Sequence, residues 1–447
     1  MSSNNTMNEY LRWRGDLTFN CDPFNEVDNL ILAQLSYVDF DGIVSEEGED
    51  KISLSEVNDQ YWKMHTEKEI LARTSFVNHS PFLLKAAAAT KRFGEVKLSG
   101  YVNYLKKEAE AQMSAICFEL GDGTSYVAFR GTDETIIGWK EDFNLSYMSR
   151  TEGQRLAVEY LNRHFKNTAM RLRVGGHSKG GNFAVFAAAY ALPQVRAQIE
   201  KVYSNDAPGF LEDITGTEEY RRVLEKTINI IPSESIIGRL FESGMKPTVV
   251  GSSGKGIFQH DALTWQVMGN RFVHVKRSDD SLFVEKVLDN WIRNVDVEAR
   301  RTFVDTVFQV LSAGGGVTMK DVRKSGFSEM VEAVTKLPRE QQKETIKVVR
   351  ELLRSGEKAL YQQIGLNDEL PGFIRKWASK RGDEIEAKAN RQEPQLTDKS
   401  QSAQKPEKET ASDREEVKES KDYSFEEEVR RLLREKTPEK ATSEAKG

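Results

Sequence analysis

The stretch of sequence that decides the fold is residues 171–188, which read RLRVGGHSKGGNFAVFAA. Its beginning predicts a strand that ends at Gly175, and its apolar, Ala-rich end predicts a helix from Asn182. Between the two, residues 176–180 (GHSKG) form a G-x-S-x-G pentapeptide around Ser178. The pentapeptide alone is common, but a strand, a sharp turn and a helix are the context that a nucleophile elbow requires. The stretch therefore indicates such an elbow, with Ser178 as its nucleophile.

Each part of this elbow has a physical reason. A strained backbone at the turn exposes the Ser178 hydroxyl, and glycine is expected at Gly176 and Gly180 because a Cβ there would clash between strand and helix. The helix N-terminus directs free N–H groups to the place where an attacking serine creates an oxyanion, so the Lys179 N–H is the expected first donor. A Gly-rich turn with an incidental serine is the alternative interpretation. A phosphate-binding loop is disfavoured because GxxxxGK[ST] is absent.

A nucleophilic serine needs a histidine base, which in this kind of site follows the serine and the acid in the chain. Of the six histidines, only His260 and His274 follow Ser178. His260 comes after a Gly- and Ser-rich loop, where the base is expected, whereas His274 lies in the strand-like run RFVHVK and is expected to be packed or exposed on a face. We therefore favour His260, with a satisfied surface histidine as the alternative. His177 is expected to fill the elbow without acting as base.

Two carboxylates are candidates for the acid that orients the histidine. Asp206 follows the predicted strand 202–204, and Glu234 follows the next predicted strand. Both positions can deliver a carboxylate to the same histidine. We favour Asp206 because its turn, 205–210 (NDAPGF), is rigid, whereas the residues around Glu234 resemble a polar helix start. A turn or capping role before Pro208 is the alternative for Asp206.

A second oxyanion donor is expected after an earlier strand. Residues 126–133 read YVAFRGTD. The predicted strand ends at Arg130, Gly131 lets the backbone turn, and Thr132 offers both an N–H and a hydroxyl. The sequence therefore predicts an oxyanion hole formed by Thr132 and Lys179.

The elements around the elbow predict an α/β protein. Residues 1 to about 90 read as largely helical, and an antiparallel hairpin is expected around the turn at 121–123. After Tyr147, strands and helices alternate for more than a hundred residues, which predicts a mostly parallel sheet covered on both faces. This order is compatible with an α/β-hydrolase fold. Predicted strands lie at 96–104, 112–120, 125–130, 171–175, 199–204, 226–231, 248–251 and 271–275, and predicted helices at 25–37, 155–167, 182–192 and 217–224.

The sequence also suggests three regions. Residues 1–280 are expected to form the hydrolase-like domain with its helical N-terminal extension, and 281–385 a helical appendage. Residues 386–447 are rich in charge and poor in core-forming residues, so a disordered tail is predicted. Within it, 423–435 (YSFEEEVRRLLRE) has a capping residue and an apolar stripe. A docking helix for a protein partner and a transient solvated helix both fit that segment.

Composition excludes several classes of protein. The net charge of −6 disfavours a nucleic-acid binder, and two cysteines, Cys21 and Cys117, make neither a disulfide framework nor a zinc site. The polar N-terminus lacks the pattern of a signal peptide, and no stretch approaches 18 apolar residues, so no transmembrane segment is predicted. We therefore expect a cytoplasmic protein in a reducing compartment, with transient contact to a membrane surface left open.

At these motifs the chain resembles the class 3 lipases, through residues 127–132 (VAFRGT), 138–139 (GW), 142–143 (DF) and the elbow. It is more similar to a bacterial branch of lipase-like α/β-hydrolases, the Mbeg-like family. That resemblance covers roughly residues 8–350. It rests on the segments 13–17 (WRGDL), 23–28 (PFNEVD), 35–44 (LSYVDFDGIV), 205–210 (NDAPGF) and 232–238 (PSESIIG), and on 259–261 (QHD) before Trp265.

The resemblance implies roles for several residues. In class 3 lipases the residue matching Thr132 is an oxyanion donor and the serine matching Ser178 is the nucleophile, and the resemblance also supports His260. The acid of that family follows the later strand and precedes Val-Pro, which favours Glu234. This chain has Glu in place of Asp there and continues with SIIG, so the identity of the acid stays open between Asp206 and Glu234.

Motif and resemblance together imply a serine hydrolase that acts on a lipid or another acyl ester and needs neither metal nor cofactor. The same site would serve a thioesterase or an acyltransferase. An interpretation from a different class is a non-catalytic adaptor that keeps the fold and recruits partners through its C-terminal region. Substrate profiling distinguishes an ester hydrolase from a thioesterase or an acyltransferase. Truncation near residue 385 distinguishes an enzyme, which should keep its turnover, from an adaptor, which should lose its partner.

Overall fold

The computed structural model describes residues 5–72, 79–106, 111–132, 136–241, 243–278, 295–302 and 304–305. The chain divides into two units, Met1–Gln392 and Glu393–Gly447, and all of the described residues belong to the first. The expected appendage therefore lies mostly outside the described residues, although 297–302 are helical as predicted. The expected disordered tail and the helix at 423–435 lie wholly outside them.

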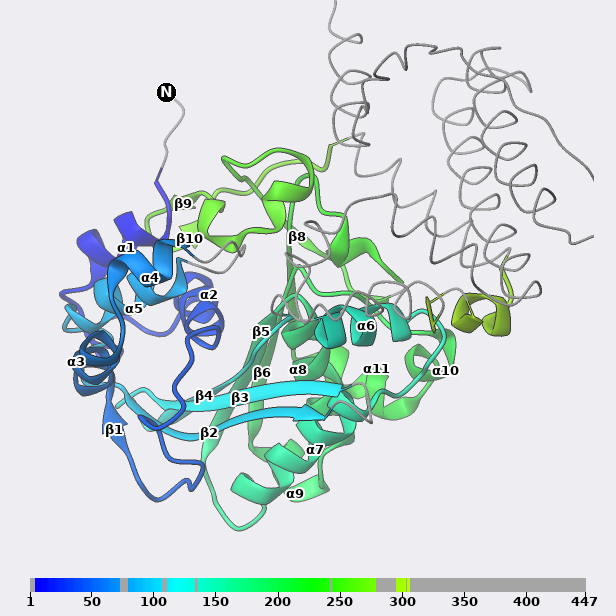
Figure 1. The fold of residues 1–447 in the computed structure, drawn as a ribbon, viewed down its shortest axis with the longest axis horizontal. Helices are drawn as coiled ribbons and strands as arrows, with labels where there is room; N and C mark the ends of the chain where they lie inside the picture. The colour runs from blue at the N-terminus through cyan, green and yellow to red at the C-terminus, as the bar shows by residue number, and fades with distance from the viewer. Residues whose placement is uncertain are drawn as a thin grey trace, which may run out of the picture. The chain divides into compact units, whose positions relative to one another are not determined.

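A single eight-stranded sheet forms the centre of the described structure, with its strands in sequence order (Figure 1). The first four strands pair antiparallel, and the fourth to the eighth pair parallel. This confirms the prediction of an α/β fold with a mostly parallel sheet. The strands are β1 (Ile52–Ser53), β2 (Lys97–Lys106), β3 (Ala111–Glu119), β4 (Thr124–Phe129), β5 (Arg171–His177), β6 (Ile199–Asn205), β7 (Thr227–Pro232) and β8 (Thr248–Val250).

The predicted hairpin joins β3 to β4. Its turn contains Gly121 and Gly123, with φ of 77° and 80°, a conformation that glycine adopts without strain. Every residue of β4 is buried, as expected for a strand that helices cover on both sides. Alternate side chains enter the two hydrophobic cores: Tyr126 belongs to one core and Val127 to the other.

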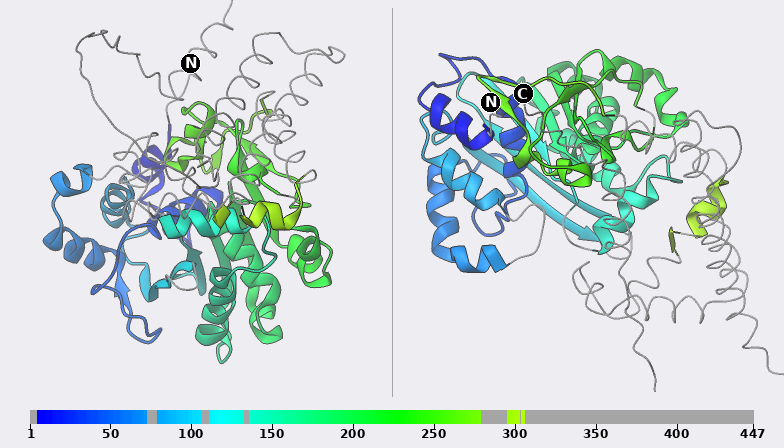
Figure 2. Two further views of the ribbon diagram at one scale, coloured as in Figure 1. Left: turned by 45° about the vertical axis from the view of Figure 1, so that its right-hand side comes forward. Right: turned by 90° about the horizontal axis from the view of Figure 1, so that it is seen from above.

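The N-terminal helices cover one face of the sheet, and the helices after β4 cover the other, as Figure 2 shows from above. The predicted helical N-terminal extension is therefore confirmed. It comprises α1 (Met7–Arg14), α2 (Glu26–Leu35), α3 (Leu54–Met64), α4 (Glu67–Ala72) and α5 (Ser80–Ala88). The later helices are α6 (Ile136–Asn144), α7 (Glu152–Phe165), α8 (Lys179–Tyr190), α9 (Pro193–Gln198), α10 (Glu212–Thr215) and α11 (Glu218–Leu224).

A buried ion pair anchors α2 inside the extension. Asp28 and Arg92 both have fully buried side chains, and Arg92 Nη2 lies 2.5 Å from Asp28 Oδ2. Tyr10 donates a further hydrogen bond to Asp28 Oδ1 at 2.8 Å. Asn25 caps the helix by accepting from the N–H groups of its first turn. Arg92 also donates to backbone carbonyl oxygens of the loop before α2, among them that of Asp22 at 3.0 Å. A buried ion pair with its hydrogen bonds satisfied in this way fixes the place of α2 within the extension.

The chain after β8 is mostly irregular. It contains the short 3-10 helices η2 (Gly256–His260) and η3 (Ala262–Thr264), and η1 (Ile237–Arg239) precedes β8. The strand predicted at 271–275 is shorter than expected: β10 (Arg271–Phe272) pairs with β9 (Val267–Met268) in a separate two-stranded sheet. Within the described ranges, no helix combines the length and the apolar character needed to cross a membrane.

Candidate active site

Ser178 lies between the end of β5 and the start of α8. Its φ of 57° and ψ of −136° are unusual for a residue with a side chain. The Ser178 N–H donates to the Asn205 carbonyl oxygen at 2.9 Å, which fixes the turn to β6. A serine held in such a conformation is the arrangement predicted for the elbow, and it is a form of backbone strain that clusters at functional sites.

The glycines of the elbow are required by space. A Cβ on Gly176 would lie 2.3 Å from the carbonyl carbon of Gly180, and a Cβ on Gly180 would lie 2.0 Å from the Phe129 carbonyl oxygen. The predicted reason for both glycines is therefore confirmed. Gly131 is restricted by space as well, because its Cβ would lie 2.5 Å from the His177 carbonyl oxygen.

Asp206 lies at the end of the neighbouring parallel strand. His177 and Asn205 are register partners of β5 and β6, so Ser178 and Asp206 leave the sheet side by side. Asp206 also has a positive φ, of 47°, and its N–H donates to the Ile230 carbonyl oxygen at 2.8 Å. The carboxyl ends of adjacent parallel strands are where sites form in α/β folds.

The structure brings Asp206 and His260 together. His260 Nδ1 lies 2.6 Å from Asp206 Oδ2, and the Asp206 side chain is fully buried while 23% of the His260 side chain is exposed. The other carboxylate oxygen of Asp206 accepts from the Ser235 hydroxyl at 2.5 Å and from the Gly238 N–H at 3.1 Å. These contacts fix the carboxylate and leave His260 Nε2 on the side away from it.

Glu234 and His274 occupy other positions. The Glu234 N–H donates to the Gln259 side chain at 3.0 Å, so Glu234 lies near the His260 loop, but the carboxylate bound to His260 is that of Asp206. His274 is 57% exposed, and its Nε2 lies 3.7 Å from Glu26 Oε1. Its exposed position agrees with the sequence analysis.

His177 does more than fill the elbow. Its Nε2 lies 2.8 Å from the His260 carbonyl oxygen and its Nδ1 lies 3.0 Å from the Tyr37 hydroxyl. Burial lowers the pKa of His177 well below its usual value, so the ring is neutral. Nε2 therefore donates to His260, and Nδ1 accepts from Tyr37. The two histidine rings also lie next to each other at an angle of 33°, with their centres 4.6 Å apart.

Asp142, on α6, is a second carboxylate that sequence reasoning did not single out as a site residue. It accepts a hydrogen bond from the Thr132 hydroxyl. Its Oδ1 is buried and, within the described part of the chain, has no hydrogen-bond partner. Burial raises the pKa of Asp142 to about 6, although the nearby Lys179 ammonium and the Thr132 hydrogen bond oppose the rise.

The sequence holds only weak signals for Tyr37 and Asp142, the two site residues that sequence reasoning missed. Tyr37 lies 140 positions before His177, and nothing in its surroundings except the LSY part of the family resemblance points to the site. Asp142 belongs to the DF pair of the resemblance to class 3 lipases. Neither residue has a chemical motif of its own, because each acts on a neighbour that folding brings close.

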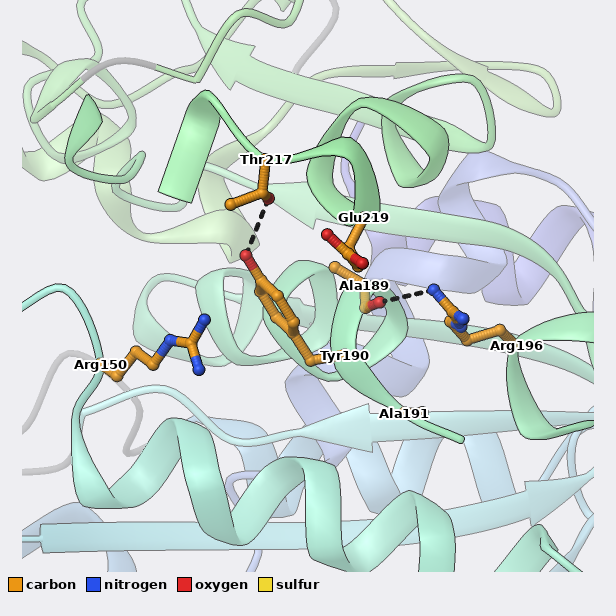
Figure 3. Close-up of a pocket in the computed structure, with 7 residues that line it drawn as sticks. All are labelled: Arg150, Ala189, Tyr190, Ala191, Arg196, Thr217 and Glu219. Atoms are coloured by element: carbon orange, nitrogen blue, oxygen red, sulfur yellow. Dashed lines mark hydrogen bonds between the residues drawn. The ribbon is translucent and has the colours of Figure 1, made fainter. Parts of the chain in front are cut away.

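One cavity in the described part of the chain lies away from these residues. It has a volume of about 370 Å³ and is lined by Arg150, Ala189, Tyr190, Ala191, Arg196, Thr217 and Glu219 (Figure 3). These residues surround the C-terminal end of α8, roughly 18 Å along the helix from Ser178. Among the residues that the structure describes, no cluster of His, Cys, Asp and Glu could hold a metal ion.

Comparison with known proteins supports the resemblance found in the sequence. The family model described as Mbeg1-like matches residues 87–309, a segment that contains Ser178, Asp206 and His260. Among curated proteins, no sequence matches the chain. The crystal structure of M37 lipase is similar to part of it, with 17% identity, coverage of 53% of this chain and 70% of that chain, and a TM-score of 0.30. The family match therefore confirms the resemblance to the Mbeg-like family.

Proposed function

We propose that this chain, whose residues 87–309 match the Mbeg1-like family, is a serine hydrolase that cleaves carboxylic esters. The observation that carries the proposal is the pair of strained turns at the ends of β5 and β6. One presents Ser178, and the other presents Asp206 to His260 at 2.6 Å. A serine, a buried carboxylate and a histidine, in this order along the chain, are the parts of an acyl-transfer site.

In the proposed mechanism His260 is the base. Its Nδ1 donates to Asp206, so the neutral ring has its lone pair on Nε2 and can take the proton of Ser178. Ser178 then attacks the ester carbonyl, and the alcohol leaves with the proton that His260 returns to it. Water hydrolyses the acyl-enzyme with His260 again as base. Asp206 stays ionised and stabilises the imidazolium in both steps.

Lys179 and Thr132 are the proposed oxyanion donors. Lys179 is the first residue of α8, where backbone N–H groups have no acceptor within the helix. Thr132 follows the end of β4, on the strand next to β5, and its hydroxyl is directed to Asp142, so its N–H is the group left for the substrate. Losing one such donor typically reduces kcat by about 10²–10³.

The substrate and location are proposals as well. The lipase resemblance favours a lipid or another acyl ester. The cytoplasmic location and the partner helix at 423–435 stay predictions from the sequence.

The test compares hydrolysis of p-nitrophenyl esters of increasing chain length by wild type, Ser178→Ala and Asp206→Asn. Glu234→Gln is the matched control, because it neutralises the rival carboxylate. We expect Ser178→Ala to show background rates, Asp206→Asn to lose about 10⁴-fold in kcat, and Glu234→Gln to stay within about twofold of wild type. Turnover that survives in Ser178→Ala contradicts the proposal, and a large loss in Glu234→Gln alone would move the acid to Glu234.

A further inference from the structure

Lys179, the residue after the elbow serine, has its whole side chain inside the protein. Lysine is almost never fully buried unless it is paired. Here the side-chain exposures of Lys179 and Glu141 are 0% and 1%, and Lys179 Nζ lies 3.1 Å from Glu141 Oε2. The ammonium also lies 5.7 Å from the centre of the Phe183 ring. The G-x-S-x-G pattern leaves the residue at this position open, so the ion pair needs an explanation of its own.

Glu141 connects Lys179 to three other elements. The Glu141 residue lies on α6, and its Oε1 accepts the N–H of Gly153 at the start of α7 at 2.9 Å. Its Oε2 accepts the N–H of Gln112 on β3 at 3.0 Å, in addition to the Lys179 ammonium on α8. A buried charge is stable when it is both paired and hydrogen-bonded. The carboxylate therefore fixes α6 against β3, α7 and α8 at one point.

The residue next to Glu141 completes a link to the oxyanion loop. Asp142 accepts a hydrogen bond from the Thr132 hydroxyl. Because Glu141 and Asp142 are neighbours on one short helix, fixing the first also fixes the second. The Lys179 side chain is thus connected through two carboxylates to Thr132, and Lys179 and Thr132 are the two proposed oxyanion donors.

We propose that the Lys179 side chain is a positioning residue for the oxyanion hole. Through Glu141 it holds α6, and α6 holds Thr132 through Asp142. The inference rests on the proposed function, and it explains why a lysine follows the serine in this elbow. Donors that are in place before the reaction need no rearrangement when charge develops on the substrate. A loose hole therefore lowers kcat more than it raises KM.

The test measures kcat and KM for p-nitrophenyl acetate with full-length wild type, Lys179→Met and Glu141→Gln. Lys140→Met is the matched control, because Lys140 lies on the same helix and pairs instead with Asp305 at 3.0 Å. We expect the first two variants to lose about tenfold or more in kcat, with KM within about twofold. The control should keep wild-type values.

The pH profile separates positioning from a general loss of stability. The Lys179 charge lowers the pKa of Asp142, and the Glu141 charge raises it. Protonation of Asp142 weakens its hold on the Thr132 hydroxyl, so under this proposal the titration of Asp142 contributes to the acid limb of kcat. Lys179→Met should therefore move that limb to higher pH, and Glu141→Gln should move it to lower pH. Asp142 also faces His260, whose charge lowers the same pKa, so both shifts are measured again in an Asp142→Asn background, where they should vanish.

Glu141→Gln keeps the shape of the side chain, so it provides a folded protein if Lys179→Met does not fold. Wild-type kcat with an unmoved acid limb in either folded variant would overturn the positioning role. A wild-type protein that does not hydrolyse the ester would instead overturn the proposed function. The two failures are therefore distinguishable in one set of measurements.

Discussion

Asp142 is a single carboxyl group whose charged form is disfavoured by its surroundings. Burial is the largest cause, and it raises the pKa of Asp142 from 3.8 to about 6. Between pH 3.8 and about 6, the Asp142 carboxyl is protonated to a greater extent in the folded state than in the unfolded state. The contribution of Asp142 to stability is therefore full at low pH and is lost as the pH rises through about 6. At about 1.36 kcal/mol per pKa unit, the loss is at most about 3 kcal/mol.

Asp142→Asn removes this titration, because the amide keeps the shape of the carboxyl group and carries no charge. We expect the variant to gain stability relative to wild type as the pH rises from about 4 to about 7, by at most about 3 kcal/mol. Urea denaturation at several pH values measures the difference. A stability difference that stays the same at every pH would contradict the raised pKa.

At this scale the sequence could identify residues that carry a motif. Ser178 was predicted from its pentapeptide, and its position at the turn agrees. The choice between Asp206 and Glu234 could not be made from spacing, because both follow strands of the same sheet. Contacts in the folded chain separate them: Asp206 is the one bound to His260. The sequence places His177 in the elbow without a role as base, and its hydrogen bond to the His260 carbonyl oxygen can be seen only in the folded chain.

At the scale of elements, the strand–turn–helix unit depends on a helix and a strand whose backbones lie in direct contact. α8 approaches β4 so closely that a Cβ on Gly180 would lie 2.0 Å from the Phe129 carbonyl oxygen. Backbone atoms cannot move aside as a flexible side chain can, so any substitution there must displace the whole N-terminus of α8. That terminus carries Lys179 and adjoins Ser178.

Gly180→Ala should therefore destabilise the protein by about 1–3 kcal/mol or more, as overpacked cores do, and it should also impair the site. Urea denaturation and ester turnover measure the two effects. Gly48→Ala is the matched control, because its Cβ would meet only His164 Nδ1, at the ordinary distance of 3.5 Å. Equal stability of the two variants would show that the close approach is not needed.

The elements that the sequence predicts are those with a clear hydrophobic periodicity or a recognisable turn. The hairpin of β3 and β4 and the parallel strands were found within a few residues. The start of α8 was placed at Asn182, whereas the helix begins at Lys179, because three residues that look like part of a glycine-rich turn are already helical. The sequence predicts no element at α6. The buried Glu141 carboxylate, which contributes to holding this helix, has no sequence pattern that would reveal it.

At the scale of the whole molecule, the N-terminal extension contributes directly to the site. Tyr37 follows α2 and donates its hydroxyl to His177 Nδ1 at 3.0 Å. His177 in turn holds the backbone of His260. The extension, which the sequence showed as a separate helical segment, therefore supports the loop that carries the proposed base. Pattern alone could not show this, because the contact joins distant parts of the chain.

Tyr37→Phe removes the hydrogen bond that holds the His177 ring in its tautomer. We expect a decrease in kcat of about tenfold with KM nearly unchanged, and a loss of stability of about 1 kcal/mol. Tyr190→Phe is the matched control, because its hydroxyl bonds to Thr217 at 2.9 Å at the far end of α8. If both variants kept wild-type kcat, the extension would have no part in the site.

The central claim, that Ser178 is a nucleophile activated by His260, is tested most directly by labelling with a fluorophosphonate probe. Full-length wild type is compared with Ser178→Ala and His260→Ala, and mass spectrometry identifies the labelled residue. The account predicts label on Ser178 in wild type, none in Ser178→Ala, and labelling slowed by about 10³-fold or more in His260→Ala. Folded wild type that takes no label, with or without detergent, or label on another residue, would contradict it.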